Sequence, residues 1–249
     1  MEILKEIDAI VQARFDSTRL PGKVLLPFGG KSLLAHIVER LSLSKYLRNI
    51  VIATTEDSIE QIREALKDYS FVKFFVGSKQ NVLERYYKAS LEYQSKVVVR
   101  ATGDNPLVCP QFLDYAIEFH FHTGADLTHY LGIPLGTGVE VINSKVLQVA
   151  YKSTKNPYDL EHVTPFIYKN RDSFTVCEPL ASGFYYAPEI KVTVDTPEDY
   201  EKVSKIFEYY KDKDFISMED IINYFECKKA TSIESLKEWV IRGVKIQTA

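Results

Sequence analysis

The sequence predicts an α/β protein in which helices cover both faces of a mostly parallel sheet. Short apolar runs alternate with amphipathic segments through the first half of the 249 residues. This order is typical of parallel strands joined by crossover helices. A long, basic connection follows the first apolar run. Because ligands of such sheets bind beyond the carboxyl ends of the strands, that connection is a candidate functional site.

Four apolar runs predict the strands of the first half, and the segments between them predict its helices. Helices are expected from near Ser32, over Ile59–Leu66 and over Val82–Ala89. Asp57 is a candidate cap for the second helix, and Ser78 or Asn81 for the third. The predicted strands are Ile7–Gln12, Ile50–Ala53, Val72–Val76 and Val97–Arg100.

The second half is less regular and adds further helices and strands. Pro197–Tyr210 predicts a helix, because Thr196 is a suitable cap and proline suits the first helical position. The tail from Ile216 predicts one or two more helices. The other expected elements are helices over Pro110–Thr123 and, interrupted at Pro165, over Tyr158–Tyr168, and strands over Val139–Ile142, Phe174–Cys177 and Lys191–Val194.

The chain contains no linker rich in glycine, proline or serine that would divide it. We expect residues 1–213 to form one domain and residues 214–249 to form a small C-terminal helical appendage of that same domain.

Composition and charge exclude several classes of function. With 45% hydrophobic and 26% charged residues and a net charge of −3, the chain is an ordinary globular protein without the basic excess of a nucleic-acid binder. Its three cysteines are too few and too scattered for a disulfide framework or a zinc site. No signal peptide is recognisable, and no apolar run approaches the roughly 18 residues of a membrane span. We therefore expect a cytoplasmic protein that binds neither nucleic acid nor membrane.

The connection from Val11 to Leu25 is unusual in length and charge. A strand-to-helix connection needs only a few residues, and longer loops in compact domains are usually functional. Between Gln12 and Lys31 the only acid is Asp16, whereas the cations are Arg14, Arg19, Lys23 and Lys31. Cations at the carboxyl end of a strand are placed to bind phosphates. The loop therefore predicts a site for a nucleoside triphosphate.

Two carboxylates are candidates for the other half of such a site. Asp104 lies in a turn after the fourth predicted strand, and Asp195 lies between a predicted strand and a helix. Each has a structural explanation by itself, since aspartate is common in turns and near helix starts. Together they suit Mg²⁺, which takes one or two protein carboxylates and completes its coordination with water and phosphate. The combination predicts exchange at a phosphorus centre.

Three segments resemble a known family and occur in the order found there. They are Gln12-Ala-Arg14…Ser17-Thr-Arg19-Leu-Pro-Gly-Lys23, Thr102-Gly-Asp104-Asn-Pro106 and Val194-Asp195-Thr-Pro-Glu-Asp199. The chain resembles the cytidylyltransferases that make CMP-activated sugars, and among them the branch named for the spore-coat polysaccharide biosynthesis protein SpsF. Weaker likenesses at Asn81-Val-Leu-Glu-Arg, Gly138-Val-Glu140-Val and Glu161-His162-Val-Thr-Pro165 extend the resemblance over roughly Ile7 to Tyr210.

The resemblance implies a Rossmann-like nucleotidyltransferase fold with three α/β/α layers, usually dimeric, and a Mg²⁺-dependent transfer of CMP from CTP to a sugar with release of pyrophosphate. It implies catalytic roles for Arg14, Lys23 and Asp104, and metal ligation by Asp104 and Asp195. The nucleotide-binding residues that it implies are Gln12, Ala13, Arg14, Arg19, Lys23, Asn81 and Thr102.

The sugar side of the site is less explicit in the sequence. Glu140, Glu161 and His162 are candidates for it, although a salt bridge explains Glu140 equally well. Two other functions are compatible with these residues: a glycosyltransferase that uses a finished nucleotide-sugar, and a nucleotide-binding protein without catalysis that assists a biosynthetic complex.

Overall fold

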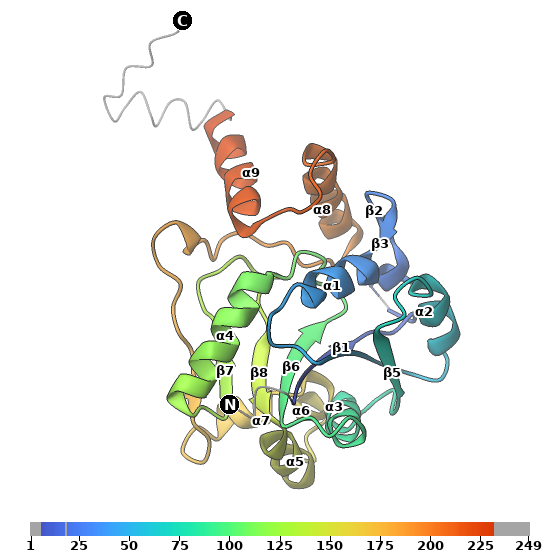
Figure 1. The fold of residues 1–249 in the computed structure, drawn as a ribbon, viewed down its shortest axis with the longest axis vertical. Helices are drawn as coiled ribbons and strands as arrows, with labels where there is room; N and C mark the ends of the chain where they lie inside the picture. The colour runs from blue at the N-terminus through green and yellow to red at the C-terminus, as the bar shows by residue number, and fades with distance from the viewer. Residues whose placement is uncertain (1–5, 18, 232–249) are drawn as a thin grey trace, which may run out of the picture.

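The fold is built around one twisted sheet. A computed structural model describes residues 6–17 and 19–231, and within these ranges seven strands form a sheet in the order β5-β4-β1-β6-β8-β7-β9 (Figure 1). The strands are β1 (Ile7–Gln12), β4 (Asn49–Thr54), β5 (Val72–Val76), β6 (Val97–Thr102), β7 (Leu127–His129), β8 (Glu140–Asn143) and β9 (Val176–Cys177).

The predicted parallel sheet is confirmed. Strands β5, β4, β1 and β6 are parallel, so their carboxyl ends lie at one edge of the sheet. Within the described sheet, β8 alone reverses direction, since it pairs antiparallel with both β6 and β7. This reversal brings Glu140, the first residue of β8, opposite Arg100 near the end of β6.

The sheet separates two hydrophobic cores, because successive residues of a strand face opposite sides. In β1, Ala9 and Val11 pack in one core and Ile10 in the other. The first core takes the apolar residues of α1 (Leu33–Ser42), α4 (Pro110–Thr123), α8 (Pro197–Tyr209) and α9 (Met218–Thr231), together with Ile62 of α2 (Ile59–Ala65). The second takes those of α3 (Val82–Glu92), α5 (Ser144–Ser153) and α7 (Pro165–Lys169), with Leu160 of α6 (Pro157–His162) packed beside it.

The capping residues predicted from the sequence are found at the helix starts, except at α2. Ser32 and Asn81 cap α1 and α3 through their side chains. Thr196 and Asp199 form a complete capping box at α8, with Pro197 in the first turn. Asp57 was the predicted cap of α2, but the N-cap position is Ser58. The Asp57 carboxylate instead accepts hydrogen bonds from Thr55 and Ser58 side chains.

The prediction of a strand over Lys191–Val194 is wrong. Lys191 forms only an isolated bridge with Leu135. The backbone then continues in extended form, with Val192 N–H donating to Leu135 O and Val194 N–H donating to Asp104 O, both at 2.8 Å. The partners of this segment lie in loops, so it never joins the sheet.

Elements that the sequence analysis missed are β7, α5, the hairpin of β2 (Pro27–Phe28) and β3 (Lys31–Ser32), and two short 3₁₀ turns, η2 (Lys23–Leu25) and η3 (Gly183–Tyr185).

The C-terminal helix packs on the body of the protein. Tyr224 of α9 contacts the rings of Tyr209 and Tyr210 at the end of α8, and both helices contribute to the first core (Figure 1). The division at residue 213 stays a prediction, and a second tail helix would lie outside the described residues. No helix in the described part of the chain is both long and apolar enough to cross a membrane.

Gly136 provides a test of how the 191–195 segment is held. Its φ is +103°, and a Cβ at this position would lie 2.5 Å from the backbone nitrogen of Thr193. We expect Gly136→Ala to lower the free energy of unfolding, measured by urea denaturation, by at least about 2 kcal/mol more than Gly124→Ala does. Gly124 is a matched control, because its φ is also positive (+66°) but nothing lies within 4 Å of an added Cβ. Equal losses in the two variants would contradict this packing.

Candidate active site

The first two segments of the site are joined by the sheet itself. Strands β1 and β6 are neighbours, and their register pairs Gln12 with Thr102. Just beyond this pair, Gly103 N–H donates to Gln12 O at 2.9 Å. A Cβ on residue 103 would lie 2.7 Å from that same oxygen, so only glycine permits this approach. The loop after β1 and the loop after β6 are therefore locked side by side.

The third segment is attached to the second through the backbone. Val194 N–H donates to Asp104 O at 2.8 Å, and Asp195 follows directly. Asp199 also accepts a hydrogen bond from the Asp195 backbone nitrogen at 3.1 Å, which fixes Asp195 at the start of α8. Lys191 in turn contacts both carboxylate oxygens of Asp199, at 2.9 and 2.8 Å. Asp104 and Asp195 are thereby held on neighbouring pieces of backbone.

Lys23 joins all three segments. Its ammonium nitrogen lies 3.3 Å from Asp104 Oδ2, 3.1 Å from Asp195 Oδ1 and 3.1 Å from Val194 O. The Lys23 side chain is only 13% exposed. Gly22, with φ +68°, turns the chain immediately before it and allows the loop to direct Lys23 inward. The structure thus brings together the lysine and the two aspartates that the sequence singled out.

The two carboxylates converge on a single positive charge. Asp195 Oδ1 also accepts a hydrogen bond from Arg19 at 2.8 Å, and Thr102 Oγ1 donates to Asp104 Oδ1 at 2.5 Å. Thr102 thereby orients the carboxylate that Lys23 contacts. Two convergent hard-oxygen donors suit Mg²⁺, which needs no larger protein cage. Among residues 6–17 and 19–231, no group of three or more His, Cys, Asp or Glu side chains could hold a metal ion.

Arg14 lies in a second charged group beside this cluster. Its Nε is 3.7 Å from Asp16 Oδ1, and its side chain remains 40% exposed. Lys79 pairs with Asp16 and, at 2.6 Å, with Asp57. The hydrogen bond from Lys79, with a second from Thr55, lowers the pKa of Asp57 to about 2. The tip of the basic loop is therefore tied to the loops after β4 and β5, while Arg14 stays accessible to a ligand.

At the end of β1, Gln12 contacts two buried polar side chains, those of Tyr86 and Arg100. The Gln12 N–H donates to the Tyr86 hydroxyl at 3.3 Å, and the Gln12 side-chain oxygen lies 3.5 Å from Arg100 Nη2. Ala13, the next residue, is almost fully buried. Burial raises the pKa of Tyr86 to about 12, so its hydroxyl remains a neutral donor, and it donates to Ala101 O at 2.8 Å.

Glu140 forms a buried ion pair. Its carboxylate accepts hydrogen bonds from Arg100 at 2.7 Å and from the Tyr168 hydroxyl at 2.9 Å. Burial by itself would lower the pKa of Arg100, but the neighbouring Glu140, Tyr86 and Asp104 together outweigh burial and raise it. Glu140 is thus engaged in a salt bridge within the protein.

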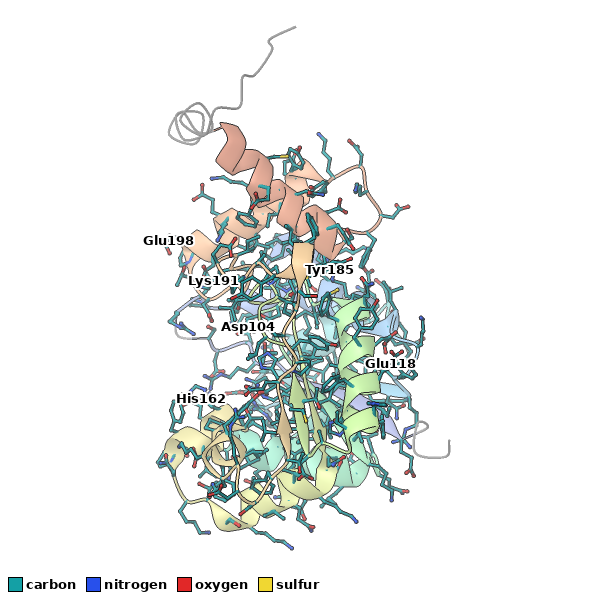
Figure 2. The ribbon with its side chains drawn as sticks, turned by 90° about the vertical axis from the view of Figure 1, so that its left-hand side faces the viewer. Asp104, Glu118, His162, Tyr185, Lys191 and Glu198 are labelled. Carbon is teal, nitrogen blue, oxygen red and sulfur yellow. The ribbon has the colours of Figure 1, made fainter. Side chains whose placement is uncertain are left out.

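Glu161 and His162 are exposed at the end of α6. His162 stacks near the ring of Tyr158, with 4.3 Å between centroids. Among the described residues, neither forms a hydrogen bond or ion pair with the Lys23 cluster. Figure 2 shows Asp104 between Lys191 and His162 along one edge of the molecule.

Asn81 uses its side chain as a helix cap. Its Oδ1 accepts a hydrogen bond from Glu84 N–H at 2.8 Å. The residue also lines a cavity of about 370 Å³, together with Tyr151, Lys152 and Lys155. The structure therefore places Asn81 at the edge of a cavity beside α3, and its side-chain oxygen is already used by the helix.

Sequence reasoning missed two charged residues of the site. Arg100 is a charged residue within the apolar run Val97–Thr102. Because a buried charge needs an oppositely charged or hydrogen-bonding partner, an arginine in such a strand indicates that a partner lies nearby. Lys79 gives no comparable signal, because its partners Asp16 and Asp57 become neighbours only when the strands are aligned.

The chain matches known proteins over most of its length. A family model for cytidylyltransferases matches residues 9–241. The spore coat polysaccharide biosynthesis protein SpsF of Bacillus subtilis (strain 168) is 35% identical over 224 residues, which cover 88% of this chain and 93% of that protein. A 3-deoxy-manno-octulosonate cytidylyltransferase of Solibacter usitatus (strain Ellin6076) is 27% identical over 244 residues, covering 82% of this chain and 95% of that protein.

A solved structure agrees with these matches. The structure of a cytidylyltransferase from Leptospira borgpetersenii serovar Hardjo-bovis (strain JB197) superposes with a TM-score of 0.80 at 28% identity, covering 98% of this chain and 99% of that one. This protein belongs to the cytidylyltransferase family.

Proposed function

We propose that this protein transfers CMP from CTP to a sugar, with release of pyrophosphate, in the biosynthesis of a polysaccharide or surface glycan. The observation that carries the proposal is the contact of one lysine, Lys23, with both Asp104 and Asp195 at the carboxyl edge of the sheet. Family membership supports the cytidylyl transfer, and the likeness to SpsF supports the glycan pathway.

In this reaction a sugar hydroxyl forms a bond to the α-phosphorus of CTP, the bond to the β-phosphate oxygen breaks, and pyrophosphate leaves. Negative charge grows on the phosphoryl oxygens, so cations fixed in advance lower the barrier. Arg14 and Lys23 are the cations proposed to contact the triphosphate, with Arg19 supporting them. Arg14 is accessible enough to do so directly.

Asp104 and Asp195 are the proposed ligands of Mg²⁺. One oxygen of each carboxylate contacts the same group, Lys23 Nζ, so the two carboxylates lie close enough together to supply the one or two protein ligands that Mg²⁺ usually takes. The ion, when bound, supplies charge neutralisation at the phosphates.

The nucleoside and the sugar are assigned to the flanks of this cluster. Gln12, Ala13 and Thr102 are proposed to face the nucleoside, and Asn81 to lie near it. Glu140, Glu161 and His162 are proposed for the sugar side. For Glu140 the role is to hold Arg100 and Tyr168 in place, because both contact its carboxylate.

We also propose a cytoplasmic homodimer. Leu131 and Leu180, joined by a backbone bridge, are 40% and 63% exposed, and Tyr186 beside them is 53% exposed. These three residues form a contiguous apolar surface, since Cβ on Gly132 would touch both Leu180 and Tyr186. Apolar surfaces of this kind mark protein contacts. The proposed occupant is a second copy of this chain.

The metal pair can be tested by charge removal. Asp104→Asn and Asp195→Asn are each expected to lower the rate of CTP-dependent pyrophosphate release by about 10²-fold or more, because each removes one oxygen ligand without changing side-chain size. Asp68→Asn, at an exposed position remote from the cluster, is the matched control. Circular dichroism should show all three variants folded. Near-normal rates in either active-site variant would refute the two-carboxylate metal site.

Nucleotide choice and reaction type can be tested together. Pyrophosphate release is measured with each of the four nucleoside triphosphates, Mg²⁺ and a panel of acidic and amino sugars. We expect release with CTP and one acceptor class. Glycosyl transfer from a nucleotide-sugar without pyrophosphate release would instead identify a glycosyltransferase. Binding of CTP with neither reaction would identify a non-catalytic nucleotide-binding protein.

The proposed dimer surface predicts a change in mass. Light scattering after size exclusion should show a dimer for the parent protein and a monomer for Leu180→Glu, because burying a carboxylate in an apolar interface is unfavourable. Leu91→Glu is the control, since Leu91 is 56% exposed on α3. A monomeric parent, or an unchanged mass for Leu180→Glu, would contradict the assignment.

A further inference from the structure

Arg14, the proposed triphosphate contact on the basic loop, has the carboxylate of Asp16 beside it. Arg14 Nε lies 3.7 Å from Asp16 Oδ1, which is too long for a hydrogen bond. That carboxylate oxygen is also buried without a hydrogen-bond partner. Asp16 therefore attracts the guanidinium by charge alone. Because the Arg14 side chain is 40% exposed, its N–H groups remain open to a ligand.

The backbone at Arg14 is fixed on both sides. Ala13 N–H donates to Ala53 O at 3.2 Å, and Phe15 N–H donates to Ser58 Oγ at 3.1 Å. These hydrogen bonds tie the basic loop to β4 and to the segment that follows it. The direction of the guanidinium therefore depends on the torsions of its own side chain, which a neighbouring charge can bias.

Lys79 connects Asp16 to a second carboxylate. Its ammonium group pairs with Asp16 through Oδ2 and with Asp57 Oδ2 at 2.6 Å. Asp57 is itself oriented by its neighbours, since its other oxygen accepts hydrogen bonds from Thr55 Oγ1 at 2.5 Å and from Ser58 Oγ at 3.2 Å. Asp16 is therefore anchored, through Lys79, to a carboxylate that is fixed on the loop after β4.

The backbone that carries Lys79 is held by helix α3. Arg85 of this helix is only 2% exposed, and its Nη1 donates to Ser78 O at 3.2 Å. Ser78 Oγ accepts a hydrogen bond from Asn81 N–H at 3.1 Å, immediately before the helix begins. Lys79 therefore projects from a loop that is secured on a buried residue, although its own side chain is half exposed.

Asp16 needs a cation of its own if this arrangement is to favour a triphosphate. A carboxylate beside a phosphate site repels the incoming anion, and a neighbouring cation offsets that repulsion. Lys79 supplies this cation by pairing with Asp16. An isolated exposed ion pair contributes little, but several charges that form a network hold their geometry better. Arg14, Asp16, Lys79 and Asp57 form such a network.

We propose that Lys79 is a positioning residue for the nucleotide: acting through Asp16, it directs the Arg14 guanidinium towards the triphosphate of CTP. The inference rests on the proposed function, in which Arg14 contacts that triphosphate. Lys79 acts on the affinity for the nucleotide and not on the bonds that form and break. Its loss therefore changes KM for CTP while kcat is largely retained.

The test removes the ammonium group and measures both turnover and binding. Lys79→Met should raise KM for CTP, and its Kd measured by titration calorimetry, by about fivefold, with kcat within about twofold of the parent. Lys79→Arg should restore most of the affinity, because it keeps the positive charge. The matched control is Lys67→Met, since Lys67 is also an exposed lysine, paired with Glu64 at 2.7 Å. An unchanged affinity in Lys79→Met, or an equal loss in Lys67→Met, would overturn the proposal.

A double-mutant cycle tests whether Lys79 acts through Arg14. Arg14→Met alone should raise Kd for CTP by about tenfold or more, because it removes a charged donor to phosphate. Adding Lys79→Met to Arg14→Met should then have no further effect, since residues that act as one unit are not additive. The effect of Lys79→Met should also vanish in Asp16→Asn. Additive losses would mean that Lys79 contacts the phosphates independently, and they would contradict a positioning role.

The binding measurement separates this inference from the proposed reaction. Calorimetry with CTP and Mg²⁺ needs no acceptor sugar, so the coupling between Lys79 and Arg14 is measured whether or not CMP is transferred. A protein that binds CTP with this coupling but transfers no CMP would contradict the proposed function and support the positioning role. A raised Kd in Arg14→Met with an unchanged Kd in Lys79→Met would overturn the positioning role alone. An unchanged Kd in Arg14→Met would overturn both.

Discussion

The contact of Lys23 with Asp104 and Asp195 is the constraint on which the rest of the site depends. Two ionised carboxylates that lie close together in a partly buried place repel each other, and a positive charge between them offsets that repulsion. Lys23 provides that charge with a side chain that is itself largely shielded from water. This one ammonium group contacts the turn after β6 and the start of α8 from within the basic loop.

The surrounding backbone is arranged so that this contact can form. Gly103 allows β6 to continue against Gln12, and the hydrogen bond between Val194 and Asp104 brings the third segment alongside. Gly22 turns the loop at a positive φ just before Lys23. Side chains farther out then orient the charged groups: Thr102 holds Asp104, and Asp199 holds the backbone at Asp195.

Much of this could be predicted from the sequence, for identifiable reasons. The bounds of β1, β5 and α4 agree with the prediction. In β1 a continuous buried run marks the strand, and in α4 Pro110 and Gly124 mark the start and the end of the helix. The approach of Lys23 to Asp104 followed from topology, since the loops after the neighbouring parallel strands β1 and β6 must meet.

What could not be predicted depends on contacts between distant segments. Lys191–Val194 has the alternation of a strand, yet its backbone partners are Leu135 and Asp104 in loops, which no local pattern reveals. Strands of two or three residues, such as β2, β3 and β7, are too short to show a period. The pairing of Lys79 with Asp16 and Asp57 likewise arises only when three strand ends are aligned.

The span of the Lys23 contacts also bears on how the protein reaches its native state. Lys23 and Asp104 are 81 positions apart, and Lys23 and Asp195 are 172 positions apart. The parallel strands that carry the first pair come early in the chain, whereas Asp195 becomes available only after most of it has been synthesised. Contacts of such high sequence separation form late and slowly. The charged centre of this enzyme is therefore among the last parts of the molecule to assemble, and nascent chains that lack the final third carry a scaffold without a complete site.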